Sequence, residues 1–221
     1  MMKQLYSGHL TVVCFTVNLV EENCYLVYDA DGHAALIDCG AYSTSEREEI
    51  AAYLSQHHLH LIGQWYTHGH FDHVWGSSFV HATYGQGVTL AAAETDNYLQ
   101  AEQLASMFLH RLVNVPLAPI DRSLSEGDVL TLGTASFSVI ATPGHTAGGI
   151  CFYCESEGIL FSGDSLFLGS IGRCDLPGGN ELQLRTALRN KVLTLPASVR
   201  VFPGHGPTTT IGHEQRYNAY I

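Results

Sequence analysis

The sequence has few basic residues and no long hydrophobic run. Only 10 of its 221 residues are Lys or Arg, whereas 21 are Asp or Glu, so the formal net charge is −11. A chain this acidic is poorly suited to bind a nucleic-acid backbone or an anionic membrane, and we expect neither partner. The one N-terminal apolar run, residues 10–20, is shorter than the roughly 20 residues that a membrane-spanning helix needs. Because only Lys3 precedes this run and no small-x-small cleavage site follows it, we expect no signal peptide and a cytoplasmic location.

The six cysteines show no spacing typical of a disulfide framework. Without a secretory signal we expect them to be reduced thiols. Cys151 and Cys154 have the spacing of a redox or zinc pair, but they lie in a strand-like run, residues 150–154. Alternation along a strand would point these two positions to opposite faces, so we predict that both side chains pack in the core.

No linker or low-complexity stretch divides the chain, and 46% hydrophobic with 14% charged residues indicates a compact globule. We therefore expect a single domain over residues 1–221. A faint internal repeat is present, because residues 25–38 align without gaps on residues 151–164. Each copy reads as a strand, an acidic glycine turn, a second strand and a closing aspartate, Asp38 or Asp164.

Hydrophobic periodicity predicts several helices and many short strands. The first helix is expected to begin with a capping box from Ser45 to Glu48. Helices are predicted at residues 43–57, 94–112 and 182–192, and shortly after residue 212. Strands are predicted at residues 12–17, 24–28, 34–38, 59–66, 88–91, 129–132, 136–141, 150–154, 159–162 and 199–202. Two groups of strands interrupted by helices favour a layered α/β or α+β fold with two sheets.

Histidine, in contrast to lysine and arginine, is abundant, with 13 copies. The densest group lies directly after a strand-like run and reads Thr67-His68-Gly69-His70-Phe71-Asp72-His73. His68 and His70 are two residues apart, so an extended chain would aim both imidazoles the same way, and Asp72 and His73 follow as the chain turns. Imidazole and carboxylate together suit zinc, and also iron or manganese.

Three later strand-like runs also end in side chains that bind metals. Two of them end in Pro-Gly-His, at His145 and His205, and the third ends in Gly163-Asp164. The candidate ligands are His68, His70, Asp72, His73, His145, Asp164 and His205. Seven ligands exceed the four of a closed structural zinc site, and they fit two divalent ions about 3.5–4 Å apart that share a carboxylate and a water.

The motif T-H-x-H-x-D-H with later PGH, GD and GH elements resembles the metallo-β-lactamase-fold hydrolases over nearly the whole chain. The resemblance implies a four-layer αββα sandwich of two similar halves, with the metals between them at the sheet edges. It also implies that Asp164 bridges two metals and that Asp38 braces the histidine loop, although Asp38 could equally cap a turn. By the same resemblance, the first metal would be held by His68, His70 and His145, and the second by Asp72, His73 and His205.

Within that family, residues 161–167, 169–175 and 210–214 are similar to the short glyoxalase II-like branch. The full glutathione-thioester hydrolases continue past the last histidine into a helical domain with basic glutathione contacts. Only 16 residues follow His205 here, so we expect no such domain and do not carry over glutathione specificity. Arg173 is assigned either to an ion pair with Asp175 or to contact with an anionic substrate. Met107 and Phe108 are assigned to the core rather than to a substrate groove.

We therefore predict a zinc-dependent hydrolase that cleaves a thioester or a related activated acyl compound in a small-molecule substrate. A metal-bound hydroxide, oriented by Asp72 and Asp164, would attack the carbonyl carbon. A thiolate leaves with little help from a general acid, and the motifs supply no such acid. One alternative is a persulfide dioxygenase with a single iron held by His68, His145 and Asp164. A lactonase and a metal storage or sensing protein are the others, and the sequence assigns no oligomeric state.

Overall fold

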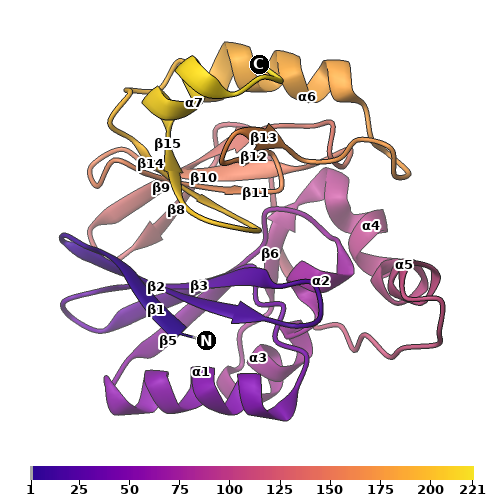
Figure 1. Ribbon diagram of the computed structural model, residues 1–221. Coiled ribbons are helices and arrows are strands. Elements are labelled where there is room, and N and C mark those ends of the chain that lie inside the picture. The colour runs from indigo at the N-terminus through magenta and orange to yellow at the C-terminus, as the bar shows by residue number, and fades with distance from the viewer. Residues whose placement is uncertain (1) are drawn as a thin grey trace.

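Two mixed β-sheets pack face to face, and helices cover their outer faces (Figure 1). This arrangement is seen in a computed structural model, which describes residues 2–221. It confirms the predicted four-layer αββα sandwich. None of the helices in the described chain is both long enough and apolar enough to cross a membrane.

In the described residues, the first sheet has seven strands that lie side by side in sequence order. They are β1 (Met2–Ser7), β2 (Leu10–Val17), β3 (Glu22–Asp29), β4 (His33–Ile37), β5 (His60–Trp65), β6 (Val88–Ala91) and β7 (Ile120–Leu124). Neighbours from β1 to β4 are antiparallel, whereas neighbours from β4 to β7 are parallel. The parallel strands β4 and β5 therefore end at the same edge of the sheet, where loops can build a site.

The second sheet has six strands among residues 2–221, and its spatial order differs from its sequence order. In spatial order they are β15 (Thr209–Thr210), β14 (Arg200–Pro203), β11 (Ile159–Gly163), β10 (Ile150–Cys154), β9 (Ala135–Ala141) and β8 (Val129–Leu132). Only the β11–β14 pair is parallel in the described sheet. A separate short hairpin consists of β12 (Leu166–Phe167) and β13 (Ser170–Ile171).

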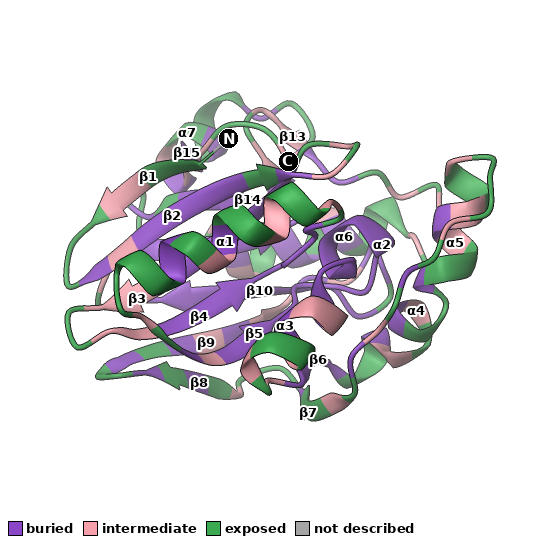
Figure 2. Cartoon of the chain, turned by 90° about the horizontal axis from the view of Figure 1, so that it is seen from below, coloured by how far each residue is buried: buried purple, intermediate pink, exposed green. Residues whose placement is uncertain are grey.

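The helices form two outer layers and one lateral group. The lateral group, beside the sheets in Figure 1, consists of η1 (Ala92–Glu94), α4 (Thr95–Leu99) and α5 (Ala101–Phe108). The first sheet is covered by α1 (Thr44–Gln56), α2 (Phe71–Val74) and α3 (Ser77–Tyr84), and the second by α6 (Glu181–Ala187), η2 (Leu188–Val192) and α7 (Ile211–Tyr217). In Figure 2, α1 shows its exposed outer residues in green over the purple buried strands.

The core has three apolar layers, one between the sheets and one under each helical layer. Between the sheets, Trp65 meets Phe137 edge to face with ring centroids 5.3 Å apart. The predicted opposite orientation of Cys151 and Cys154 is confirmed, because Cys154 packs between the sheets and Cys151 packs under α6. All six cysteines are unpaired, and Cys174 alone among them is partly exposed.

The internal repeat corresponds to the same hairpin in each sheet. β3 pairs with β4 as β10 pairs with β11, and the next partner, β5 or β14, is parallel in both sheets. The strand registers differ by one residue, because Leu26 faces Leu36 whereas Phe152, its aligned counterpart, faces Phe161. The two halves therefore share an architecture but differ in detail.

Two helix predictions are wrong in detail. The capping box of α1 is formed by Ser43 and Glu46, not by Ser45 and Glu48: Glu46 N donates to Ser43 Oγ at 3.3 Å, and Ser43 N donates to Glu46 Oε2 at 2.8 Å. The other Glu46 oxygen accepts from Asn18 N, a contact outside the helix that the local pattern does not contain.

The helix predicted over residues 94–112 is divided into η1, α4 and α5, and it ends at Phe108. The chain turns at Gln100, which caps both α4 and α5. Tyr98, just before this turn, is buried and donates to Ala118 O at 2.8 Å, which anchors α4 against the first sheet. After the turn, α5 buries Ala101 and Ala105 instead of its larger side chains.

Candidate metal centre

Four predicted ligands lie on the segment that follows β5. His68 comes three residues after the end of β5, His70 occupies the N-cap position of α2, and Asp72 and His73 lie within that short helix. The imidazole rings of His68 and His70 converge, with centroids 4.7 Å apart, as their two-residue spacing predicts. All four side chains are buried.

His145 joins His68 and His70 from the second sheet. It follows β9, and its Nε2 lies 2.9 Å from His70 Nδ1, which in turn lies 3.1 Å from His68 Nε2. The three ring nitrogens therefore lie close together. Nitrogen donors with metal bonds of about 2.0–2.1 Å must approach one another this closely when they share an ion.

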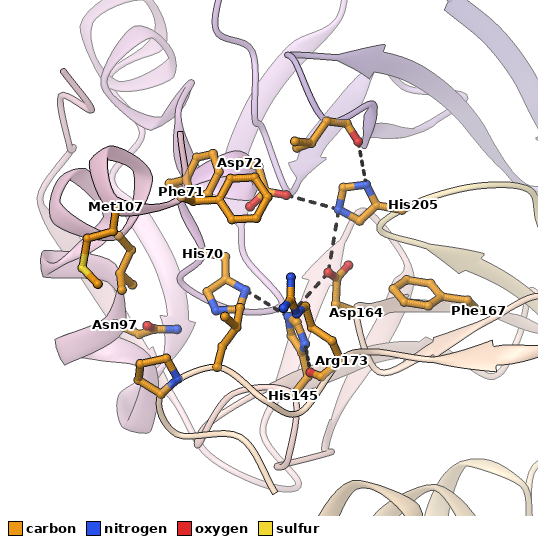
Figure 3. Close-up of a pocket in the computed structure, with 15 residues that line it drawn as sticks. His70, Phe71, Asp72, Asn97, Met107, His145, Asp164, Phe167, Arg173 and His205 are labelled. Carbon is orange, nitrogen blue, oxygen red and sulfur yellow. Dashed lines mark hydrogen bonds and ion pairs between the residues drawn. The ribbon is translucent and has the colours of Figure 1, made fainter. Parts of the chain in front are cut away.

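Asp72, His73 and His205 form a second group beside the first. His205 Nε2 lies 3.2 Å from Asp72 Oδ2, and His73 Nε2 lies 3.7 Å from the same oxygen. His205 follows β14, so this group too combines the loops of both sheets (Figure 3).

Asp164 lies between the two groups. Its Oδ1 is 3.3 Å from His73 Nε2, and its Oδ2 is 3.5 Å from His145 Nε2 and 3.7 Å from His205 Nε2. One carboxylate thus faces histidines of both groups, as a bridging position requires.

The residues fit divalent metal ions. His73 Nε2 and Asp164 Oδ1 are buried, yet neither has a hydrogen-bond partner within residues 2–221. Buried polar atoms without partners are rare because their desolvation is costly, and a metal would satisfy both. Each of the three groups His68–His70–His145, His68–His73–Asp164 and Asp72–His73–His205 has ligand atoms within 4.8 Å of one another.

Burial and neighbouring charges determine how these groups ionise. Burial lowers the pKa of His70 to about 4 and, with the neighbouring histidines, lowers the pKa of His68 well below its usual value. Burial alone would also lower the pKa of His73, but the Asp164 and Asp72 carboxylates outweigh it and raise this pKa well above its usual value. Burial likewise opposes the ionised form of Asp164, yet His73 holds its pKa well below the usual range.

Asp38 contacts the histidine segment from behind. Its Oδ1 accepts from Thr67 N at 2.7 Å, and its Oδ2 accepts from Thr67 Oγ1 at 2.7 Å and lies 3.1 Å from His73 Nδ1. Since the Thr67 hydroxyl donates to Asp38, it is free to accept from His68 Nδ1, 3.0 Å away. Contacts of this kind fix the orientation and tautomer of metal-binding histidines.

Backbone carbonyls hold the two later histidines. His145 Nδ1 donates to Arg173 O at 2.7 Å, and His205 Nδ1 donates to Val20 O at 3.2 Å. The Arg173 side chain makes the ion pair that the sequence left open, with two hydrogen bonds of 2.7 and 2.8 Å to Asp175. Both side chains of this pair are more than half exposed.

The glycines of the two Pro-Gly-His motifs allow close packing at the site. A Cβ on Gly204 would collide with Asp164 Oδ1 and His73 Cε1. Gly144 has a φ of +134°, and a Cβ there would collide with the backbone of Asn180 and Leu184 at the start of α6. The glycine before each histidine therefore lets the strand end approach its neighbours closely.

Comparison with known proteins agrees with this geometry. Residues 17–205 match the Metallo-beta-lactamase superfamily. The chain belongs to that superfamily. A relative from Haemophilus influenzae, named hydroxyacylglutathione hydrolase GloC, is 32% identical and aligns over 96% of this chain and 98% of its own.

Two crystal structures are similar to this chain in three dimensions as well as in sequence. BLEG-1 B3 metallo-beta-lactamase is 35% identical with a TM-score of 0.86, covering 100% of this chain and 99% of its own. TTHA1623 in a di-iron-bound form is 36% identical with a TM-score of 0.83, covering 94% and 99%. The family resemblance inferred from the motifs is confirmed.

Sequence reasoning missed Glu94, which links two loops of the candidate metal centre. The side chain is buried, its Oε2 accepts from Gly69 N at 2.8 Å, and its Oε1 accepts from Gly148 N at 2.7 Å. It therefore holds the segment of His68 and His70 against the loop of His145. A single glutamate at the start of an expected helix gives no sequence signal for this role.

Glu22 was also missed. It is fully buried at the start of β3, 4.0 Å from His73 Nδ1, and burial raises its pKa well above the usual value. It lies just before the strand predicted at residues 24–28, next to Glu21, and nothing in that pattern connects it with a residue 51 positions away.

The site opens into a pocket of about 540 Å³. His70, Asp72, His145, Asp164 and His205 line it. The assignment of Met107 and Phe108 to the core is wrong: both line this pocket, and their exposed fractions are 62% and 47%. Their helical spacing is the same for a pocket-facing helix as for a core-facing one, so periodicity alone could not separate the two.

Proposed function

We propose that this chain is a metal-dependent hydrolase that cleaves thioesters or related activated acyl compounds of small-molecule substrates. The observation that carries the proposal is the convergence of five imidazoles and two carboxylates, five of which line a pocket of 540 Å³. The name of the similar GloC protein, a hydroxyacylglutathione hydrolase, supports the same reaction class.

We assign the site two divalent ions, held by His68, His70 and His145 and by Asp72, His73 and His205, with Asp164 between them. Zinc is our choice because it suits a mixed imidazole and carboxylate set. Iron is the alternative, since the similar TTHA1623 structure is a di-iron form. When bound, such ions lower the pKa of water and polarise an acyl carbonyl oxygen.

The protein's own contribution is to position the attacking water. Burial alone would raise the pKa of Asp72, but His73 and His205 outweigh burial and hold this pKa below its usual value. The pKa of Asp164 is also below its usual value. Both carboxylates are therefore ionised at neutral pH. They line the pocket and can accept a proton or hydrogen bond from a water between them.

The leaving group needs little assistance. Among the described pocket-lining residues, the imidazoles are those of His70, His145 and His205, which the metals would occupy. A thiolate, whose thiol has a pKa of about 8.5, leaves without a general acid, whereas an amide nitrogen does not. The site is accordingly better suited to thioesters than to amides.

Metal analysis combined with a substrate panel tests the proposal. Protein purified without added metal should contain about two equivalents of zinc and hydrolyse a small acyl thioester. The His70→Ala variant should lose metal and more than about 100-fold in kcat/KM, because loss of a mere supporting contact already costs 10–100-fold. His213→Ala, an exposed histidine on α7, is the matched control and should retain both.

Three results would contradict the proposal. One iron per chain with rapid oxygen uptake on glutathione persulfide would indicate a dioxygenase. Turnover of lactones without turnover of thioesters would indicate a lactonase. Tight metal binding with no turnover of any compound would indicate metal storage or sensing.

A further inference from the structure

The pocket above the candidate metal centre has a wall that is largely apolar. Phe71 lies between His70 and Asp72 in the sequence, and its ring centroid is 5.6 Å from that of Phe108 on α5. Phe167 lies on the other side of the pocket, beyond Asp164, and Leu176 also lines the pocket. The apolar surface therefore begins at the candidate ligands themselves and continues outward.

Helix α5 is oriented in an unusual way for a surface helix. It buries its small residues, Ala101 and Ala105, against the first core layer and leaves Met107 and Phe108 substantially exposed. Large apolar side chains grouped at the mouth of a pocket mark a binding surface more often than a free surface. The flexible methionine side chain can also adapt to apolar ligands of different shape.

The polar groups of the wall are already engaged. The Arg173 guanidinium is paired with Asp175 through two hydrogen bonds. The Asn97 amide donates to Glu94 Oε2 at 3.1 Å. Within the described lining, the other charged or ionisable side chains are the candidate ligands, so Arg173, held in its ion pair with Asp175, is the one cation offered to an anionic substrate.

We infer that this pocket binds a substrate whose acyl or thiol part is an extended apolar group, and that the α5 face is its binding surface. The inference rests on the proposed hydrolase function, whose substrate class it specifies. A volume of 540 Å³ lies within the range that encloses most of a drug-sized molecule. It leaves room for a chain of several carbons beyond the reacting carbonyl.

Binding is measured first, because it does not depend on turnover. Alkyl thioethers of N-acetylcysteamine have no carbonyl to cleave, and their affinity for the metal-loaded protein is determined as the alkyl chain grows from two to eight carbons. We expect affinity to increase by about fourfold per methylene, the factor that corresponds to burial of one CH₂ group. Affinity that does not change with chain length would overturn the inference.

Turnover is then measured with two thioester series. One series lengthens the acyl group on N-acetylcysteamine, and the other lengthens the alkanethiol of an acetyl thioester. A rise of kcat/KM with length in the first series assigns the apolar wall to the acyl group, and a rise in the second assigns it to the leaving group. Turnover that is independent of length in both series, or highest for a hydroxyacyl glutathione thioester, would overturn the inference and leave the hydrolase proposal standing.

If thioether affinity depends on chain length but no thioester is turned over, the inference about the pocket stands without the hydrolase proposal. The apolar pocket would then be established and the proposed function would fail. The two conclusions can therefore be separated.

Substitutions on α5 test whether this helix causes the dependence of turnover on chain length. In whichever series depends on length, Met107→Ser and Phe108→Ser should each lower the ratio of kcat/KM for the longest substrate to that for the shortest by about tenfold. This ratio cancels any loss of folded protein. Leu112→Ser is the matched control, because Leu112 is 96% exposed and lies outside the pocket lining. An unchanged ratio in both α5 variants, or an equal loss in the control, would contradict the assignment of this face.

Discussion

Asp38 and Asp164 close the two copies of the repeated hairpin, but they occupy different positions relative to the candidate metal centre. Asp164 faces three histidines, whereas Asp38 lies behind the site against Thr67 and His73. The same sequence position thus supplies a candidate ligand in one half and a supporting carboxylate in the other. Asp38 has a φ of 52°, a conformation that aspartate and asparagine adopt more readily than most residues.

The Asp38→Asn variant should bind metal about 10–100-fold more weakly while remaining folded. Asparagine tolerates the backbone conformation, but its NH₂ group cannot accept from both Thr67 and His73. Competition with a chelator of known affinity measures the change. Asp31→Asn, an exposed position in the same hairpin, is the control, and equal affinities for the two variants would contradict the role of Asp38.

Acidification should remove metal from the His68–His70–His145 group and from the Asp72–His73–His205 group at different pH values. The pKa of His73 is well above its usual value and that of His205 is raised, whereas the pKa of His70 is about 4. A protonated imidazole has no free lone pair, so histidines with raised pKa values lose metal first as the pH falls. Metal content after dialysis between pH 8 and 4.5 should fall in two steps, with the Asp72–His73–His205 group emptied first. Loss of both ions in one step would contradict this order.

At the scale of elements, the start of α1 shows how a tertiary contact selects one of two possible capping boxes. The chain contains two overlapping S-x-x-E patterns, and the structure uses the first, Ser43 with Glu46. The choice depends on Asn18, whose backbone N–H donates to Glu46 from the loop after β2. Such a contact joins segments 28 residues apart, so no short window of sequence contains it.

Ser43→Ala should destabilise the protein by about 1 kcal/mol, because it removes the N-cap acceptor of α1. Ser45→Ala should change the free energy of unfolding by less than about 0.5 kcal/mol, since Ser45 is exposed and lies inside the helix. Urea unfolding of the two variants measures both values. The reverse ranking would contradict the assignment of Ser43 as the N-cap of α1.

Most strands, the two-sheet architecture and the clustering of the seven candidate ligands could be predicted from the sequence. Buried strands leave continuous apolar runs, and the ligands lie in compact motifs at strand ends. The edge strands β1 and β7 were not predicted, because they are largely exposed and polar and so have no apolar pattern. Glu94 and the pocket face of α5 were not predicted either, since both depend on tertiary contacts rather than on spacing.

At the scale of the whole molecule, the candidate metal centre joins the two halves. His68 to His73 follow the first sheet, whereas His145, Asp164 and His205 follow strands of the second. Backbone hydrogen bonds cross the same boundary, from Ile150 N to Thr67 O and from Asn23 N to Gly204 O. Bound ions would therefore act as cross-links between the sheets.

Chelation of the metals should lower the melting temperature. A ligand present at 100 times its dissociation constant stabilises the folded state by about 2.7 kcal/mol. For a chain of this size, each kcal/mol corresponds to a shift of roughly 2–4 °C, so we expect a fall of about 5–10 °C. Thermal melts before and after treatment with EDTA, and after metal is restored, measure the effect. Identical melts of the chelated and metal-loaded protein would contradict a cross-linking role.

The unequal burial of the six cysteines makes this molecule suitable for site-specific labelling. Five thiols are buried in the native state and should not react, whereas Cys174 is partly exposed. Cys174 directly follows Arg173, whose carbonyl accepts from His145 and whose side chain lines the pocket. Because burial raises the pKa of the Cys174 thiol, alkylation should be slow at neutral pH and faster in mild alkali. A maleimide fluorophore should attach once per native chain and not at all to Cys174→Ser, and its emission would then report occupation of the pocket without altering a candidate ligand.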